Sequence, residues 1–177
     1  VLSQTTLTFT KTGDNYWTVP CDVTSITLEV WGAGGGGQAV NGTNVRGAGG
    51  AGGGYVKTTY TVVPGQTYRI YVGRGGTVND TRKSGEGSWF ESASAVFAVG
   101  GTGAGLVLTS GVGTGAVALT TGNIGGTLIN TYGGNGANGF DDGTTKYSGG
   151  GGSSAGDVNG NNALGMTGGL APTNGIK

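Results

Sequence analysis

The sequence of 177 residues contains no histidine, one cysteine and three prolines, and charged residues make up only 10% of it. Without histidine it lacks the commonest general base and the commonest metal ligand of proteins. With a single cysteine as well, a zinc site and an internal disulfide framework are both excluded. Few acids and bases remain from which a catalytic site could be built, so we expect no enzyme and no cofactor.

Net charge and long apolar runs are also missing. Nine basic residues balance nine acidic ones, and the formal net charge is zero. A nucleic-acid binder would carry a basic stripe, and a membrane-spanning helix needs about 18 consecutive apolar residues. We therefore expect neither a nucleic-acid partner nor a membrane span. A neutral surface also offers little electrostatic protection against self-association.

Glycine is what the sequence has in excess. It occupies 44 of the 177 positions, about a quarter, where roughly 7% is usual. Such a composition often means disorder, because glycine loses more backbone freedom on folding than any other residue. Here, however, hydrophobic residues still make up 34% and fall in alternating blocks. The glycines also lack the period of three that collagen requires, so we predict a folded glycine-rich domain.

Alternation of apolar and polar β-formers predicts strands in the first hundred residues. The segments with this pattern are residues 5–10, 16–19, 26–31, 55–63 and 68–73, with shorter ones at 89–90 and 95–99. Residues 11–15 and 64–65 have turn composition, and no window has a helical period. The sequence therefore predicts an all-β fold with a small antiparallel β-sandwich.

Three glycine runs, at residues 32–37, 47–54 and 149–152, have almost no side chains. A glycine chain in the polyproline-II conformation has three residues per turn and rises about 3.1 Å per residue. Several such helices can pack closely and satisfy their N–H and C=O groups between them. We predict a layer of packed polyglycine-II-like helices, with Trp31 and Tyr55 clamping the run ends. Flexible glycine loops are the alternative.

The second half contains short apolar segments at residues 106–108, 117–119 and 128–129, separated by Gly, Thr and Ser. They are interpreted as very short strands or as lids over the glycine layer. We expect a single domain over residues 1–177, in which a β-sandwich with glycine-run insertions (1–103) continues into a glycine-rich extension (104–177).

Two motifs with chemical associations have simpler explanations. Gly32, Gly34 and Gly37 fit the G-x-G-x-x-G pattern of dinucleotide sites, but residues 38–44 cannot supply the helix that such a site needs. Residues 157–161 have the rhythm of a calcium loop at Asp157, Asn159 and Asn161. Position twelve would be Gly168 in place of the bidentate glutamate. An Asx-rich turn is predicted, with a loose calcium site as the alternative.

Three isolated aromatics in the last third, Tyr132, Phe140 and Tyr147, are the candidate contact residues. They either pack over glycine backbone or stand on loops as the exposed contacts of a binding tip. Cys21 follows Pro20 and is expected to be a small buried residue, with an intermolecular bridge or a reactive thiol as the alternatives. The chain begins at Val1 without methionine, and we expect it to be secreted, extracellular or at the cell surface.

Five segments carry a family resemblance: residues 17–37 (WTVPCDVTSITLEVWGAGGGG), 52–56 (GGGYV), 64–73 (PGQTYRIYVG), 85–89 (GEGSW) and 100–103 (GGTG). They resemble the glycine-rich domain of secreted bacterial proteins, notably of the Bacteroidetes type, and of phage tail-fibre receptor-binding tips. The resemblance covers about residues 5–103, and beyond that only glycine content agrees. It departs from the family pattern at Cys21 and in residues 106–129.

The resemblance implies a β-sandwich fused to a layer of glycine helices, without catalytic activity. Two functions follow as expectations. The first, which we favour at this stage, is a self-assembling subunit of an extracellular filament or surface layer, with residues 5–10 completing a neighbour's sheet. The second is an adhesin or phage receptor-binding tip, whose loops recognise a cell-surface glycan or an outer-membrane protein.

Overall fold

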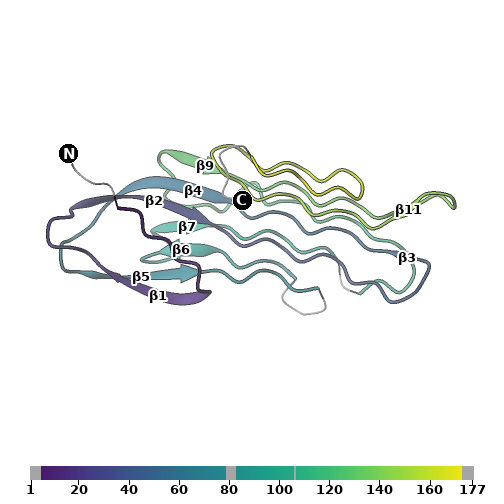
Figure 1. Cartoon of the computed structure of the whole chain (residues 1–177), viewed down its shortest axis with the longest axis horizontal. Helices are drawn as coiled ribbons and strands as arrows, with labels where there is room; N and C mark the ends of the chain where they lie inside the picture. Colours follow the sequence, from purple (N-terminus) through teal and green to yellow (C-terminus); the bar gives the residue numbers. More distant parts are fainter. Residues whose placement is uncertain (1–4, 79–82, 106, 173–177) are drawn as a thin grey trace.

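The computed structural model describes residues 5–78, 83–105 and 107–172. Its larger sheets gather at one end of an elongated molecule, and the glycine runs extend side by side toward the other end (Figure 1). The described residues contain strands and no helix. The all-β prediction is therefore confirmed, whereas the antiparallel sandwich stays a prediction.

Two larger sheets form the broad end. The first has the order β1-β5-β6-β7 and the second the order β2-β4-β9, and every pairing within them is antiparallel. The strands of the first sheet are β1 (Gly13–Thr18), β5 (Thr67–Val72), β6 (Ser88–Phe90) and β7 (Val96–Ala98). Those of the second are β2 (Ser25–Trp31), β4 (Tyr55–Thr61) and β9 (Ile129–Thr131).

Two small sheets lie along the glycine runs. A parallel pair joins β3 (Val45–Arg46) to β8 (Gly111–Val112). An antiparallel hairpin joins β10 (Phe140–Asp141) to β11 (Lys146–Tyr147). Each of these short strands lies next to a glycine-rich stretch, at residues whose side chains can form a ladder.

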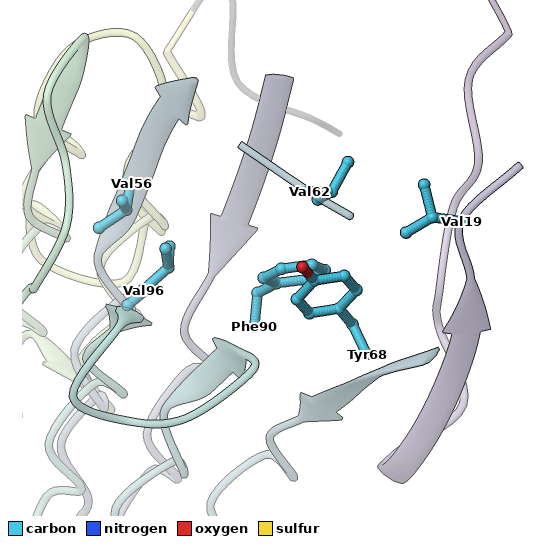
Figure 2. Close-up of a cluster of buried hydrophobic side chains, with 7 residues drawn as sticks. Val19, Val56, Val62, Tyr68, Phe90 and Val96 are labelled. Carbon is cyan, nitrogen blue, oxygen red and sulfur yellow. The ribbon is translucent and has the colours of Figure 1, made fainter. Parts of the chain in front are cut away.

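Side chains from both larger sheets meet in one buried cluster, which Figure 2 shows. Its members are Val19, Val56, Val62, Tyr68, Phe90, Val96 and Ala98. The Tyr68 and Phe90 rings stack with their centroids 5.1 Å apart, and Tyr60 meets Phe90 edge-on at 5.2 Å. Alternate residues of β2 pack against this cluster, as the period-two pattern predicted.

Two local predictions in the N-terminal part are wrong. Residues 5–10 form no strand despite their alternation, because they pair with no other strand of the described residues. Residues 13–15 were expected in a turn but belong to β1, whose register with β5 runs from Gly13–Val72 to Thr18–Thr67. Cross-strand pairing there outweighs the turn preference of Gly, Asp and Asn.

The other expectations for single segments have mixed outcomes. Cys21 is exposed in the turn between β1 and β2, so the expectation of burial is wrong, because a tight turn after Pro20 places it at the surface. Among the short apolar segments, residues 128–129 adjoin β9, and Leu108 forms an isolated bridge with Val40. Residues 117–119 form no strand, and residue 106 lies outside the described part.

The glycine runs form a layer held by backbone hydrogen bonds that recur every third residue. We call the runs 32–37, 47–54, 100–104, 113–118, 133–139, 149–155 and 160–169 the glycine layer. The polyglycine-II helices expected from the sequence are not seen as assigned elements. Successive hydrogen bonds between two runs are nevertheless three residues apart in each run. The Gly35 N–H donates to the Ala51 carbonyl and the Gly32 N–H to the Gly54 carbonyl, both at 2.9 Å.

The same step of three occurs between other runs, in both relative directions. Antiparallel neighbours bond from Gly49 to Ala137 and from Gly52 to Gly134. Parallel neighbours bond from Gly149 to Gly47, from Gly152 to Gly50 and from Ala155 to Gly53. The runs thus satisfy one another's backbone groups, as a buried segment without a regular sheet must.

Close approach of the backbones explains why these positions are glycine. A Cβ added at Gly35 would overlap the Thr102 carbonyl, and one at Gly52 would overlap the Ser153 carbonyl. Only glycine allows this spacing. At the sheet end, the Trp31 and Tyr55 rings are in contact, with centroids 4.8 Å apart and planes tilted by 36°. Both residues belong to the β2–β4 pair, next to the ends of two glycine runs. The expected aromatic contact at the run ends is therefore present.

Asparagine side chains bond the runs at the edge of the glycine layer. Asn138 and Asn135 accept hydrogen bonds from the N–H groups of Gly115 and Ala118, each at 2.7 Å. Asn162 in turn accepts from the Asn135 N–H at 2.7 Å. Because Asn135 and Asn138 are three residues apart, both reach the same neighbouring run. The asparagines of the last third thus replace carbonyl acceptors.

Candidate functional site: an aromatic hairpin at the narrow end

The β10–β11 hairpin lies at the end of the molecule opposite the large sheets (Figure 1). Phe140 pairs with Tyr147, and Asp141 with Lys146. The turn between them is built by its own sequence. Gly143 adopts a φ of 88°, a conformation that suits glycine, and its N–H donates to the Asp141 carboxylate at 2.9 Å.

The aromatic rings of this hairpin form one surface. Phe140 and Tyr147 stack with centroids 5.2 Å apart and 19° between their planes. The Phe140 side is open, with 40% of the residue exposed, whereas Tyr147 is half-buried. Tyr147 is backed by Gly165, where an added Cβ would lie 3.2 Å from the phenol oxygen. The pair is therefore a supported, partly exposed aromatic platform.

Two basic side chains flank the Asp141 carboxylate. Arg46, at the end of β3, lies 3.7 Å from it, and Lys146 lies 3.9 Å away. The Arg46 guanidinium also donates to the carbonyls of Thr43 and Val45, which fix its position. The hairpin thus combines an aromatic surface with hydrogen-bond donors and a carboxylate acceptor.

Asp142 holds the hairpin turn through the backbone. Its carboxylate accepts the N–H groups of Thr145 and Thr144, at 2.6 and 2.9 Å. The hydrogen bond from Thr145, followed by that from Thr144, holds the pKa of Asp142 below its usual value.

Acid should therefore loosen this turn. The pKa of Asp142 is lower in the folded state than in the unfolded state. The stability that its carboxylate contributes is therefore present above the unfolded-state pKa and is lost as the pH falls through the folded-state pKa. Over this acidic pH range we expect the Thr144 and Thr145 amides to lose protection against hydrogen exchange, which NMR can follow. In Asp142→Ala they should be unprotected at neutral pH. Protection that stays constant into acid in the unmodified chain would contradict this role.

A family model described as a glycine-rich domain matches residues 9–176. The chain belongs to the glycine-rich domain family. The match includes residues 106–129, so the apolar segments that looked like a departure lie within the family region. The comparison with curated proteins found no match.

Of the three aromatic candidates in this glycine-rich domain, two come together and one does not. Tyr132 directly follows β9, near the large sheets, and its N–H donates to Asn159 at 2.9 Å. It therefore lies away from the Phe140–Tyr147 pair (Figure 1).

Sequence reasoning did not identify Arg46, Asp141 or Lys146 as part of the site. The Asp-Asp-Gly turn between Phe140 and Tyr147 was the available signal for the hairpin.

The residues considered for calcium make other contacts in the glycine-rich domain. Asn159 accepts the Tyr132 N–H, and the Asn161 amide donates to the Leu170 carbonyl at 2.7 Å. Burial, followed by the charges of Glu29 and Asp157, raises the pKa of Tyr55. Within the described ranges, no three His, Cys, Asp or Glu side chains gather as metal ligands. Nor do those ranges hold a helix long and apolar enough to cross a membrane.

Proposed function

We propose that the glycine-rich domain is a binding module, an adhesin or phage-type receptor-binding tip, that recognises a cell-surface glycan or an outer-membrane protein. The observation that carries this proposal is the stacked, partly exposed Phe140–Tyr147 pair at the end opposite the large sheets. A ligand on a cell surface also places the protein outside the cell.

The composition of the hairpin suits such a ligand. An aromatic surface offers apolar contact area at low conformational-entropy cost, and a sugar ring has C–H groups that can lie against it. Arg46 and Lys146 supply donors and Asp141 supplies an acceptor, as the few well-placed polar groups of a binding site do. We therefore assign ligand contact to the hairpin and Arg46.

The glycine layer would serve as a rigid support for this site. Its hydrogen bonds advance by three residues on both partners, which supports packed polyglycine-II-like helices, since that conformation has three residues per turn. A rigid support reduces the ordering cost of binding. The large sheets would then anchor the opposite end.

Substitutions in the hairpin test the proposal. Phe140→Ala and Tyr147→Ala should each weaken binding by roughly 30-fold, as expected for a central aromatic contact. The measurement is binding of the labelled protein to a panel of bacterial cells and to a glycan array. Tyr132→Ala is the matched control and should bind like the unmodified chain. Equal losses in all three variants, or in none of them, would contradict the assignment.

A self-assembling subunit of a surface filament or layer is the second candidate, and one observation favours it. The last run of the glycine layer and the residue after it expose Leu164, Met166 and Leu170, with Leu164 80% exposed. An uncharged apolar surface of this kind can pack against another copy. Electron microscopy of the native protein at micromolar concentration tests this candidate: regular filaments or sheets would support it, and discrete particles would remove it.

A further inference from the structure

One edge of β2 has no partner strand among the described residues. β2 is the end strand of its sheet, and its ladder with β4 is bracketed by bonds from Val62 N–H to the Thr24 carbonyl and from Gly32 N–H to the Gly54 carbonyl. Hydrogen-bonded residues alternate along an antiparallel pair. The even-numbered residues of β2 therefore bond β4, and the backbone groups of the odd-numbered ones point away from it.

The backbone groups on this outward edge find hydrogen-bond partners only after the strand ends. Ala33, the next odd-numbered residue, donates its N–H to the Glu86 carbonyl at 3.0 Å and accepts from the Gly101 N–H at 2.8 Å. No described residue makes a backbone hydrogen bond to the outward groups of the odd-numbered residues of β2. These residues are Ser25, Thr27, Glu29 and Trp31. An open edge of this length is a template for another strand.

A groove of about 1380 Å³ runs along this edge, and every residue of β2 lines it. Small-molecule pockets usually measure roughly 300–1,000 Å³, so the groove is large enough for a segment of polypeptide. Its walls include Trp17, Ile70 and Trp89. The carboxylate of Glu29 is paired with Lys57 at 3.0 Å, so no unpaired Glu29 charge opposes an apolar, uncharged occupant.

Residues 5–10 already lie in this groove but do not pair with β2. They alternate Thr with Leu7 and Phe9 and carry no charge, a composition that favours a strand. Residues 5–8 are nevertheless exposed. The segment leads to Gly13, where β1 starts, and β1 is an edge strand of the first sheet, whereas β2 belongs to the second sheet. The segment therefore crosses the molecule from the groove to β1 (Figure 1). This tether prevents it from running along β2 of its own chain.

We propose that the β2 edge binds residues 5–10 of a second copy of the chain, in a reciprocal strand exchange. A segment from another copy has no tether across the groove and can lie along the outward groups of β2. Leu7 and Phe9 would then face the apolar wall on one side of the new strand. Because each copy both gives and receives the segment, the exchange closes as a two-fold dimer. The dimer interface and the distal hairpin lie at opposite ends.

Sedimentation velocity on the full chain at increasing micromolar concentrations tests this proposal. The unmodified chain should form dimers. Thr27→Pro removes an outward N–H that β4 does not use, and proline is tolerated on that side of an edge strand. It should weaken dimerisation about tenfold or more, whereas Thr27→Ala should dimerise normally. A monomeric unmodified chain, or equal dimerisation of Thr27→Pro and Thr27→Ala, would overturn the proposal.

A second pair of variants covers the case in which Thr27→Pro fails to fold. Leu7→Pro/Thr8→Pro changes a segment that belongs to none of the described strands. The N–H groups of consecutive residues in a strand point to opposite edges, so one of the two removed N–H groups would face β2 in the exchanged strand. This variant should be monomeric, and Leu7→Ala/Thr8→Ala should dimerise more strongly than it. Equal behaviour of the two would overturn the exchange. Cell binding through the hairpin should persist in both, because the two sites are separate.

Discussion

Gly35→Ala is expected to destabilise the protein by about 3 kcal/mol or more, as overpacking against a fixed backbone does. A Cβ at this position would overlap the carbonyl of Thr102, and the neighbouring run cannot retreat without losing its own hydrogen bonds. The measurement is the free energy of unfolding from denaturant titration.

Gly34→Ala is the matched control for this prediction. An added Cβ at Gly34 would lie 3.9 Å from its nearest neighbour, the Ala51 carbonyl oxygen. Its φ is not positive, so this variant should keep or slightly raise stability, by about 0.4–1 kcal/mol at most. Gly152→Ala and Gly151→Ala repeat the comparison, because a Cβ at Gly152 would overlap the Gly134 carbonyl, whereas one at Gly151 would lie 3.5 Å from the Gly50 carbonyl oxygen, an ordinary contact. Similar stabilities within each pair would show that the runs are not closely packed.

Phe90→Ala is expected to lower the free energy of unfolding by about 3–5 kcal/mol. Phe90 is 2% exposed and contacts the rings of Tyr60 and Tyr68, so truncation leaves a cavity in the cluster of Figure 2. Thermal or denaturant unfolding measures the loss.

Phe140→Ala is the comparison for Phe90, with the same chemical change at the partly exposed hairpin. It should cost less than about 1 kcal/mol of stability while reducing ligand binding. If Phe140→Ala unfolds the protein as readily as Phe90→Ala, the hairpin is part of the folding core, and its role as a separate contact site is wrong.

The sequence predicted best where a strand's pattern and its pairing agree. The alternation of residues 26–31 and 68–73 corresponds to β2 and β5, because one side of each strand packs on the shared core. Residues 5–10 show the limit of this reasoning. Their pattern is equally regular, but a strand also needs a neighbour whose free backbone groups it can lie alongside, and a local pattern does not contain that information.

The candidate site was predictable only in part, because its members come from distant parts of the chain. Phe140 and Tyr147 were identified by type, and the turn between them brings them together. Arg46 reaches Asp141 only because β3 lies beside the hairpin in the glycine layer. The bonds between Asn135 and its neighbouring runs likewise depend on which glycine runs are adjacent. In segments with so few side chains, composition does not specify that order.

Hydrogen–deuterium exchange on the native protein, read at the glycine-layer amides, tests the central claim that this layer is a folded body. Gly35, Gly49 and Gly52 each donate to a neighbouring run, so their amides should be protected to a degree comparable with those of β4 and β5. Gly34 and Gly151, whose N–H groups donate to no backbone carbonyl of the described residues, supply internal comparisons and should exchange faster. Exchange of all glycine-run amides at the rate of an unfolded chain would contradict the account and leave flexible loops in place of a rigid support.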